Sequence, residues 1–168
     1  MRRAAISAEN AGAGPVIVVV GAFADEVRSA VETVDDVIIV ANPDWASGLA
    51  SSLTKGIEVA QAMNCDAALV MTTDQPLIDA AGLEELIDAF DAQRRIVASS
   101  YAGIIGVPAV FGAEHFDGLM KLRGDEGAGR WLRARSAKVT QIRIDSASVD
   151  IDTPADVDRL HANDPKTI

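Results

Sequence analysis

Short runs of apolar and β-branched residues alternate along the chain with segments whose apolar residues recur at helical spacing. The expected strands cover residues 16–21, 36–42, 67–73, 95–101 and 138–145, with a shorter one at 108–111. The expected helices cover residues 24–34, 51–63, 79–93, 113–122 and 125–136, and a last helix follows residue 153. This alternation predicts an α/β protein with a mostly parallel sheet and helices on both faces. Ligands of such folds bind at the carboxyl ends of the strands.

Three helix starts carry side chains that favour N-caps. Ser51, Asp79 and Thr153 each open a helical segment, and their oxygens can accept hydrogen bonds from the free N–H groups of a first turn. Pro154 follows Thr153 at the first helical position, where a missing N–H is tolerated. We therefore expect helices to begin at these three points.

Length and composition predict one domain over residues 1–168 with a core of small aliphatic side chains. Of the residues, 49% are hydrophobic but only 4% are aromatic, and a chain of this size can bury a core without disulfides. The single cysteine, Cys65, excludes an internal disulfide and favours a reducing, cytoplasmic location. No apolar run is long enough to span a membrane. A net charge of −10 argues against nucleic acid or anionic lipid as a partner, but not against a nucleotide bound through a divalent cation.

The stretch VMTTDQP places a carboxylate at the end of a buried strand. Asp74 follows the apolar run, and Pro76 fixes the chain just beyond it. A turn could use Asp74 for its own hydrogen bonds, since Asp and Pro are common turn residues. A metal site at the carboxyl end of the strand could use it equally well. The local sequence does not separate these two interpretations.

A second acidic motif, VDIDTP, lies near the C-terminus. Asp150 and Asp152 are two residues apart, so both carboxylates share one face if this stretch is an extended strand. Two adjacent like charges are costly unless a cation or a helix N-terminus compensates them. The motif therefore predicts either a divalent-cation site, to which Asp74 would add a third oxygen donor, or an acidic helix cap formed by Asp152 and Thr153.

The loop NPDWASGLASS joins a strand to a helix and is rich in small residues. Gly48, Ser51 and Ser52 would let a ligand approach the backbone, whose N–H groups can bind anions or the edge of a base. Trp45 in the same loop could stack on a ligand or cover the core. An ordinary capped helix would explain Ser51 but not the composition of the whole loop.

The order of these motifs resembles one enzyme family. The series is N-P-x-W-x-x-G-x-x-S-S-L-x-x-G, D-Q-P, Y-x-G-x-x-G-x-P-x-x-F, L-x-G-D-x-G-A and D-I-D-T-P-x-D. Over residues 15–161 it resembles the MobA-like nucleotidyltransferases, and most closely the molybdenum-cofactor cytidylyltransferases. The resemblance implies a Rossmann-like, three-layer α/β fold. It also implies an Mg²⁺-dependent transfer of CMP or GMP from an NTP, with CTP favoured over GTP, to a phosphorylated acceptor such as molybdopterin.

The resemblance assigns roles by matching position. The metal-binding residues would be Asp74, Asp150 and Asp152, of which Asp74 and Asp152 would be catalytic. The residues matched to the nucleotide-binding loop are Gly48, Ser51 and Ser52. The residues matched to the acceptor side are Gly106, Pro108, Gly124 and Asp125.

The chain departs from the family at its N-terminal end. The family begins with a strand and a glycine-rich loop, L-A-A-G-x-S-x-R-M-G-x-x-K, whose donors hold the triphosphate, and nothing similar precedes AGAGPVIVVVGA. The difference is about 30 residues, the size of one strand–loop–helix unit. A sheet without that strand exposes apolar surface and unpaired backbone groups. A swapped segment, a dimer, a rearranged edge or a further segment could each fill the gap, so a homo-oligomer is one expected state.

Two other functions stay open at this point. A non-catalytic homologue would keep the fold as a binding or self-associating module. A sugar-phosphate nucleotidyltransferase would use the same chemistry on a different acceptor.

Overall fold

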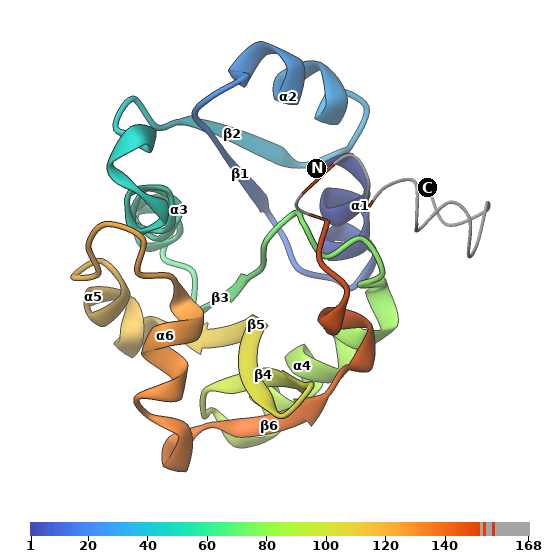
Figure 1. Ribbon diagram of the computed structural model, residues 1–168, viewed down its shortest axis with the longest axis vertical. Coiled ribbons are helices and arrows are strands. Elements are labelled where there is room, and N and C mark those ends of the chain that lie inside the picture. Colours follow the sequence, from blue (N-terminus) through green and yellow to red (C-terminus); the bar gives the residue numbers. More distant parts are fainter. Residues whose placement is uncertain (152, 154–155, 157–168) are drawn as a thin grey trace.

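The computed structural model describes residues 1–151, 153 and 156 (Figure 1). Its α-helices are α1 (Arg2–Asn10), α2 (Ala24–Val31), α3 (Leu49–Ala62), α4 (Ala80–Gln93), α5 (Phe116–Leu119) and α6 (Ala128–Arg133). Its strands are β1 (Val16–Val20), β2 (Val37–Ala41), β3 (Ala67–Val70), β4 (Val97–Tyr101), β5 (Ile104–Gly112) and β6 (Thr140–Arg143). Short 3₁₀ helices are η1 (Trp45–Ser47), η2 (Ala113–His115), η3 (Ser136–Lys138) and η4 (Asp145–Ser148). The predicted α/β class is confirmed, and none of the described helices could cross a bilayer.

The strands form two separate sheets. β1 and β2 pair in parallel, and the second sheet has the order β3-β5-β4-β6. β4 and β6 are parallel, whereas β5 runs antiparallel to both β3 and β4. The arrangement is therefore mixed, because the β4–β5 hairpin places an antiparallel strand beside β3. Within the described part of the chain, β1 pairs only with β2 and β3 only with β5.

Helices cover both faces of the strands and give three layers (Figure 1). On one face, α3, α5 and α6 pack against β5 in a cluster that includes Ile57, Phe111 and Leu132. On the other face, α1 and α4 pack in a cluster that includes Leu86 and Val110. Phe111 and Val110 are neighbours in β5 and point to opposite layers, as successive residues of a strand do. The helices and strands thus enclose β5 on both sides.

The helix starts test the predicted N-caps. α4 begins after Asp79, whose carboxylate accepts a hydrogen bond from the Gly82 N–H at 3.0 Å, so this cap is confirmed. The predicted cap at Ser51 is wrong, because α3 begins at Leu49 and Gly48 occupies the N-cap position. The Ser51 hydroxyl instead donates back to the Gly48 carbonyl at 2.8 Å. Thr153 donates through its N–H and hydroxyl to the Asp156 carboxylate at 2.8 and 2.7 Å, and Pro154 lies outside the described residues.

Three segments differ from the sequence-based elements. Helix α1 was not predicted from the sequence, although its buried residues Ala5, Ser7 and Ala8 lie on one face. β5 has nine residues rather than a short stretch at 108–111, because its first half pairs with the end of β4 in a hairpin. Asp150 and Ile151 do not form a strand. The expected strand at the second acidic motif is therefore wrong for the described residues.

Candidate functional site

Asp74 lies just beyond β3, and the second acidic motif lies against it. The Thr72 hydroxyl donates to the Asp74 carboxylate, which closes a short turn. The Ile151 N–H donates to the Asp74 carbonyl at 2.7 Å. This bond places Asp150, the residue before Ile151, beside the end of β3. The turn and the strand-end site are thus compatible, since the backbone of the turn is bonded to the second acidic motif.

The side chain of Gln75 anchors the turn that follows β3. Only 6% of Gln75 is exposed. Its Nε2 donates to the carbonyls of Ala147 at 2.8 Å and Val107 at 3.2 Å, and lies 3.3 Å from the Tyr101 hydroxyl. One buried amide therefore ties together β4, β5 and η4, and the sequence motif D-Q-P gave no sign of this role. A buried amide with satisfied partners fixes the residues beside it, here Asp74.

Tyr101 reports the electrostatic field of the two carboxylates. Burial is the main cause that raises the pKa of Tyr101, and the charges of Asp150 and Asp74 raise it further. The hydrogen bond from Gln75 and the charge of Arg133 act in the opposite direction. Both carboxylates therefore lie close enough to act on one hydroxyl.

The single tyrosine makes this field measurable. We expect the ultraviolet titration of Tyr101 to have its midpoint above the ordinary value of about 10. Because its folded pKa is raised, its contribution to stability is present below about pH 10 and is lost as pH rises through the folded pKa. Asp150→Asn should lower the midpoint, and Asp88→Asn on the exposed side of α4 should leave it unchanged. An unchanged midpoint in both Asp150→Asn and Asp74→Asn would contradict the proximity of these groups.

A buried asparagine organises the loop that follows β2. Asn42 is 2% exposed, and its Nδ2 donates to the hydroxyls of Ser51 at 2.8 Å and Ser52 at 3.0 Å. Its Oδ1 accepts from the Asp44 N–H at 3.0 Å. Sequence reasoning missed Asn42 as a positioning residue, although an Asn-Pro pair at a strand end is a turn signal. Asn42 therefore fixes both serines that were matched to nucleotide binding.

The residues matched to the acceptor side fall into two groups. Gly48 packs against Gly124, since a Cβ at Gly48 would lie 2.4 Å from the Gly124 carbonyl and 2.8 Å from Asp125 Oδ1. The Ala50 N–H also donates to the Gly124 carbonyl at 2.9 Å. Gly124 and Asp125 thus lie with the nucleotide-binding loop.

The second group lies on the β4–β5 hairpin. A Cβ at Gly106 would lie 2.5 Å from the Tyr101 hydroxyl. Pro108 is fully buried and follows Val107, whose carbonyl accepts from Gln75 and Tyr101. Gly106 and Pro108 therefore lie beside Tyr101 and the Val107 carbonyl.

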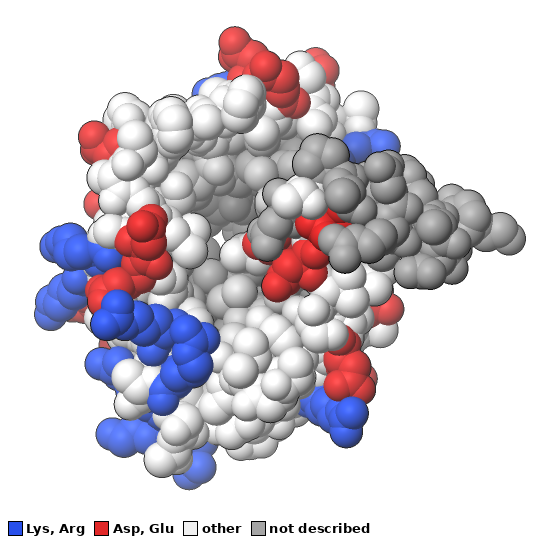
Figure 2. Space-filling model, viewed as in Figure 1, with Lys and Arg blue, Asp and Glu red and all other residues white. Residues whose placement is uncertain are grey.

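One hollow reaches from the start of α3 to the acidic end of β3, and Asp74 and Ser52 are the residues matched to the family's site that line it. Ser52, Leu49, Thr72 and Asp74 line the same cavity. Figure 2 shows a hollow at the centre of this face with acidic side chains on its rim, and basic side chains gathered over α5 and α6. The described residues contain no group of three metal-binding side chains, and Asp152 lies outside them. Two carboxylates still fit Mg²⁺ or Mn²⁺, because such ions take one or two carboxylates and complete their shell with water and phosphate.

Residues 1–139 match the MobA-like NTP transferase domain. The chain belongs to the MobA-like NTP transferase family. The match confirms the resemblance that the motif series indicated, and it includes Asp74 and the loop of Gly48, Ser51 and Ser52.

The chain is also similar to a curated protein and to solved structures. The purine catabolism protein PucB of Bacillus subtilis (strain 168) is 29% identical over 120 residues, which cover 70% of this chain and 58% of PucB. The chain therefore spans less than two thirds of that relative. The solved Rv0371c homologue from Mycobacterium sp. strain JC1 is 29% identical with a TM-score of 0.75, covering 96% of this chain and 81% of the other. Rv0371c from Mycobacterium tuberculosis H37Rv, solved in complex with manganese, is 28% identical with a TM-score of 0.68, covering 94% and 83%.

Gly48 of this MobA-like chain lies where a side chain would be poorly tolerated. Its φ of 111° and ψ of 173° are reserved for glycine, and a Cβ would overlap the Gly124 backbone. We expect Gly48→Ala to lower the free energy of unfolding by roughly 2–4 kcal/mol through strain and overlap together. Gly103→Ala is the matched control, because φ there is 78° but no atom lies within 4 Å. Chemical denaturation should show the smaller loss in Gly103→Ala, and equal losses would contradict the overlap.

Proposed function

We propose that the chain is a Mg²⁺-dependent nucleotidyltransferase that transfers CMP or GMP from an NTP to a phosphorylated acceptor, with CTP and molybdopterin as the first choice. The observation that supports this most is the bond from the Ile151 N–H to the Asp74 carbonyl. It joins the only two acidic motifs of the predicted site at the end of β3. The same hollow also holds Ser52 of the loop that follows β2.

The acidic residues would hold the cation. Asp74 and Asp150 offer carboxylate oxygens, and Asp152 would add a third, by its place in the motif. When bound, the cation screens the phosphate oxygens of the NTP. Thr72 and Gln75 keep Asp74 in place through the contacts described above.

The glycine and serine loop would orient the nucleotide. The Asn42 side-chain amide donates hydrogen bonds to the hydroxyl oxygens of Ser51 and Ser52 and thereby fixes the orientation of both hydroxyl groups. Gly48 and Gly124 bring two backbones into contact beside it, and this contact holds the loop next to the expected position of the nucleotide. The acceptor would lie between Asp125, at this contact, and Gly106 and Pro108, near Tyr101. Catalysis in this arrangement comes from positioning and charge compensation.

Pyrophosphate release tests the proposal. The chain is incubated with Mg²⁺ or Mn²⁺, each NTP in turn, and molybdopterin or a panel of sugar phosphates. We expect release above background with CTP and molybdopterin. Turnover only with sugar phosphates would show that the acceptor is a sugar phosphate and not molybdopterin. Turnover with neither acceptor would contradict the proposal that the chain is a nucleotidyltransferase.

A second candidate is a homologue that binds without catalysing transfer. The division of the strands into two sheets favours it, because β1 and β3, which both line the hollow, do not pair with each other. Equilibrium dialysis with CTP and Mn²⁺ separates the two candidates. Binding of CTP together with no pyrophosphate release would support the non-catalytic one.

A further inference from the structure

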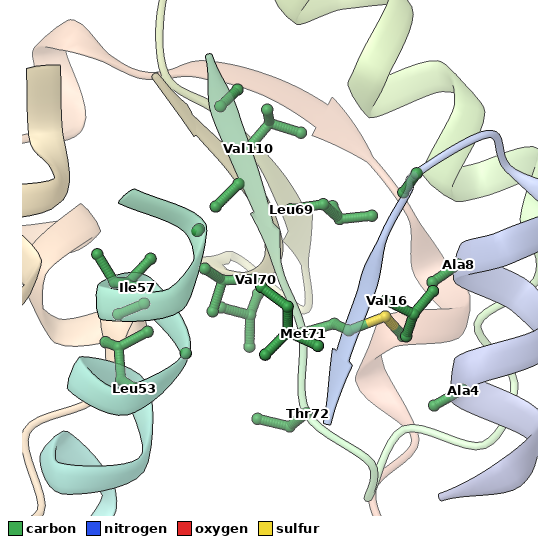
Figure 3. A pocket seen from close by; sticks show the side chains of 18 of the residues that line it. Ala4, Ala8, Val16, Leu53, Ile57, Leu69, Val70, Met71, Thr72 and Val110 are labelled. Carbon is green, nitrogen blue, oxygen red and sulfur yellow. The ribbon is translucent and has the colours of Figure 1, made fainter. Parts of the chain in front are cut away.

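A second hollow, which we call the basic hollow, lies at the end of the second sheet that is opposite to Asp74. It has a volume of about 1020 Å³ and is lined by the residues before β4, by those between α6 and β6, and by His115 and Trp131. β3 and β4 both run antiparallel to β5, and β6 runs parallel to β4. The amino ends of β3, β4 and β6 therefore lie on one side, and Asp74, just beyond β3, lies on the other. The cavity at Asp74 has mainly apolar walls, among them Leu53 and Met71 (Figure 3), so the two hollows differ in position and in chemistry.

Three permanent cations line the basic hollow. They are Arg95, Arg135 and Lys138, and no ion pair joins any of them to a carboxylate within the described part of the chain. Arg94 also lines it and has a partner in Asp91, at 3.8 Å. None of the described residues around the hollow is an aspartate or a glutamate, although the whole chain has a net charge of −10. The basic hollow therefore concentrates positive charge that its own lining leaves uncompensated.

The backbone holds these three cations on one framework. The Thr140 N–H donates to the Ile96 carbonyl at 2.8 Å, which places the segment after Arg95 beside the segment after Lys138. The Lys138 N–H donates to the Arg135 carbonyl at 2.8 Å and closes the short turn between them. Since the ordering of loops is one of the costs of binding, this arrangement favours an ion that contacts several of the cations at once.

The Arg135 guanidinium is held over a tryptophan ring. Its Cζ lies 4.0 Å from the centroid of Trp131, and its Nη1 donates to the Trp131 carbonyl at 3.4 Å. The His115 ring meets the same indole edge-on, with centroids 5.6 Å apart, and Glu114 lies 3.6 Å from its Nε2. Only 7% of Trp131 is exposed, so the indole orients a guanidinium and leaves little of its surface for a base to stack on. The basic hollow is therefore suited to recognise a ligand through its charge.

We propose that the basic hollow binds an oligophosphate chain of two or more phosphate groups. One phosphate group carries about −1.5 to −2 charges at pH 7, so two or three groups match the charge of Arg95, Arg135 and Lys138 together. Guanidinium groups bind phosphate oxygens through two parallel hydrogen bonds, and a lysine adds a point charge. Free pyrophosphate or tripolyphosphate and the phosphate tail of a nucleotide offer the same chemistry. The proposal does not rest on the proposed function, because the basic hollow shares neither carboxylates nor loop residues with the candidate site.

Trp131 supplies a local signal for this binding. The chain has two tryptophans, and Trp45→Phe leaves Trp131 as the only one. A phosphate bound to the Arg135 guanidinium changes the charge next to the indole, so the emission of Trp131 should change as well. We expect tripolyphosphate to bind at least tenfold more tightly than inorganic phosphate, both titrated at constant ionic strength. EDTA is present throughout, so that no divalent cation can carry the ligand to Asp74.

CTP distinguishes the two sources of the phosphate chain. Tighter binding of CTP than of tripolyphosphate, with the same change in Trp131 emission, would assign the basic hollow to the phosphate tail of a nucleotide. Weaker binding of CTP would assign it to a free oligophosphate. Both results support the proposal, because the phosphate chain is common to the two ligands.

Variants that remove one charge locate the bound chain. Arg95→Gln and Lys138→Gln each remove one cation of the basic hollow, and calorimetry should show an affinity for tripolyphosphate about tenfold lower, the scale of one hydrogen bond to a charged group. Arg3→Gln and Lys121→Gln remove the same charges from exposed positions outside the hollow and should change the affinity by less than about twofold. All four side chains are exposed, so the fold should be retained.

Three results would overturn the proposal. One is an affinity for tripolyphosphate no higher than that for inorganic phosphate, which would mean that these ions act only through general screening. A second is an equal loss of affinity in the two variants of the hollow and in the two controls. The third is tighter binding of a hexaglutamate peptide than of tripolyphosphate, because that result assigns the basic hollow to an acidic peptide.

Discussion

Asp74→Asn is expected to slow nucleotidyl transfer strongly while leaving the fold in place. The amide is the same size as the carboxylate and can still accept the hydrogen bond from the Thr72 hydroxyl. The Ile151 N–H bonds to the backbone carbonyl, so this contact does not depend on the side chain. What the substitution removes is one negative charge at the point where a cation would bind.

The expected effect is large because the charge acts in the transition state. We expect the rate of pyrophosphate release to fall by roughly 10²-fold or more, the scale seen when one preorganised electrostatic partner is lost. Affinity for Mn²⁺, measured by electron paramagnetic resonance, should fall by about tenfold or more, because such ions depend on few carboxylates. Asp88→Asn removes an equal charge from an exposed position of α4 and should change neither value. Full turnover by Asp74→Asn would show that Asp74 only closes the turn.

The fold could be predicted where local pattern and tertiary packing agree. Continuous apolar runs marked β1 and β2, and the Asp79 cap marked the start of α4. The prediction failed where a local choice was overruled by a distant contact. Ser51 has good capping chemistry, but α3 begins at Leu49, next to the contact between Gly48 and Gly124, and the Ser51 hydroxyl accepts a hydrogen bond from Asn42.

The site could be predicted only in part, for a similar reason. Asp74 and the loop around Gly48 could be proposed for it from strand-end and small-residue motifs, and their roles stay predictions. Asn42, Gln75 and Tyr101 could not, because their roles are set by partners up to 72 positions away in the sequence. Their side chains are ordinary polar ones in the sequence. Only their burial in the structure shows that they satisfy backbone and side-chain groups that water does not reach.

Gln75→Glu is expected to be the most destabilising polar substitution near the site. The side chains have the same shape, but Nε2 of Gln75 serves the carbonyls of Ala147 and Val107. An ionised carboxyl there would face oxygen atoms only, next to the charges of Asp74 and Asp150 that already act on Tyr101. Leaving a buried charge uncompensated costs about 3–5 kcal/mol. Gln75→Ala, which only removes the donor, should cost about 1–3 kcal/mol.

The pH dependence distinguishes charge from lost packing. The introduced carboxyl would have a folded pKa above its unfolded value of about 4.3. The stability of the variant is therefore retained at low pH and lost as pH rises through the folded pKa. Thermal unfolding at pH 5 and pH 8 should show Gln75→Glu approaching Gln75→Ala at pH 5 and falling below it at pH 8. Gln93→Glu is an exposed isosteric change beside the Thr140 hydroxyl, and its stability should not show this loss between pH 5 and pH 8. The same pH response in both glutamate variants would mean that Gln75 is not held in the buried network.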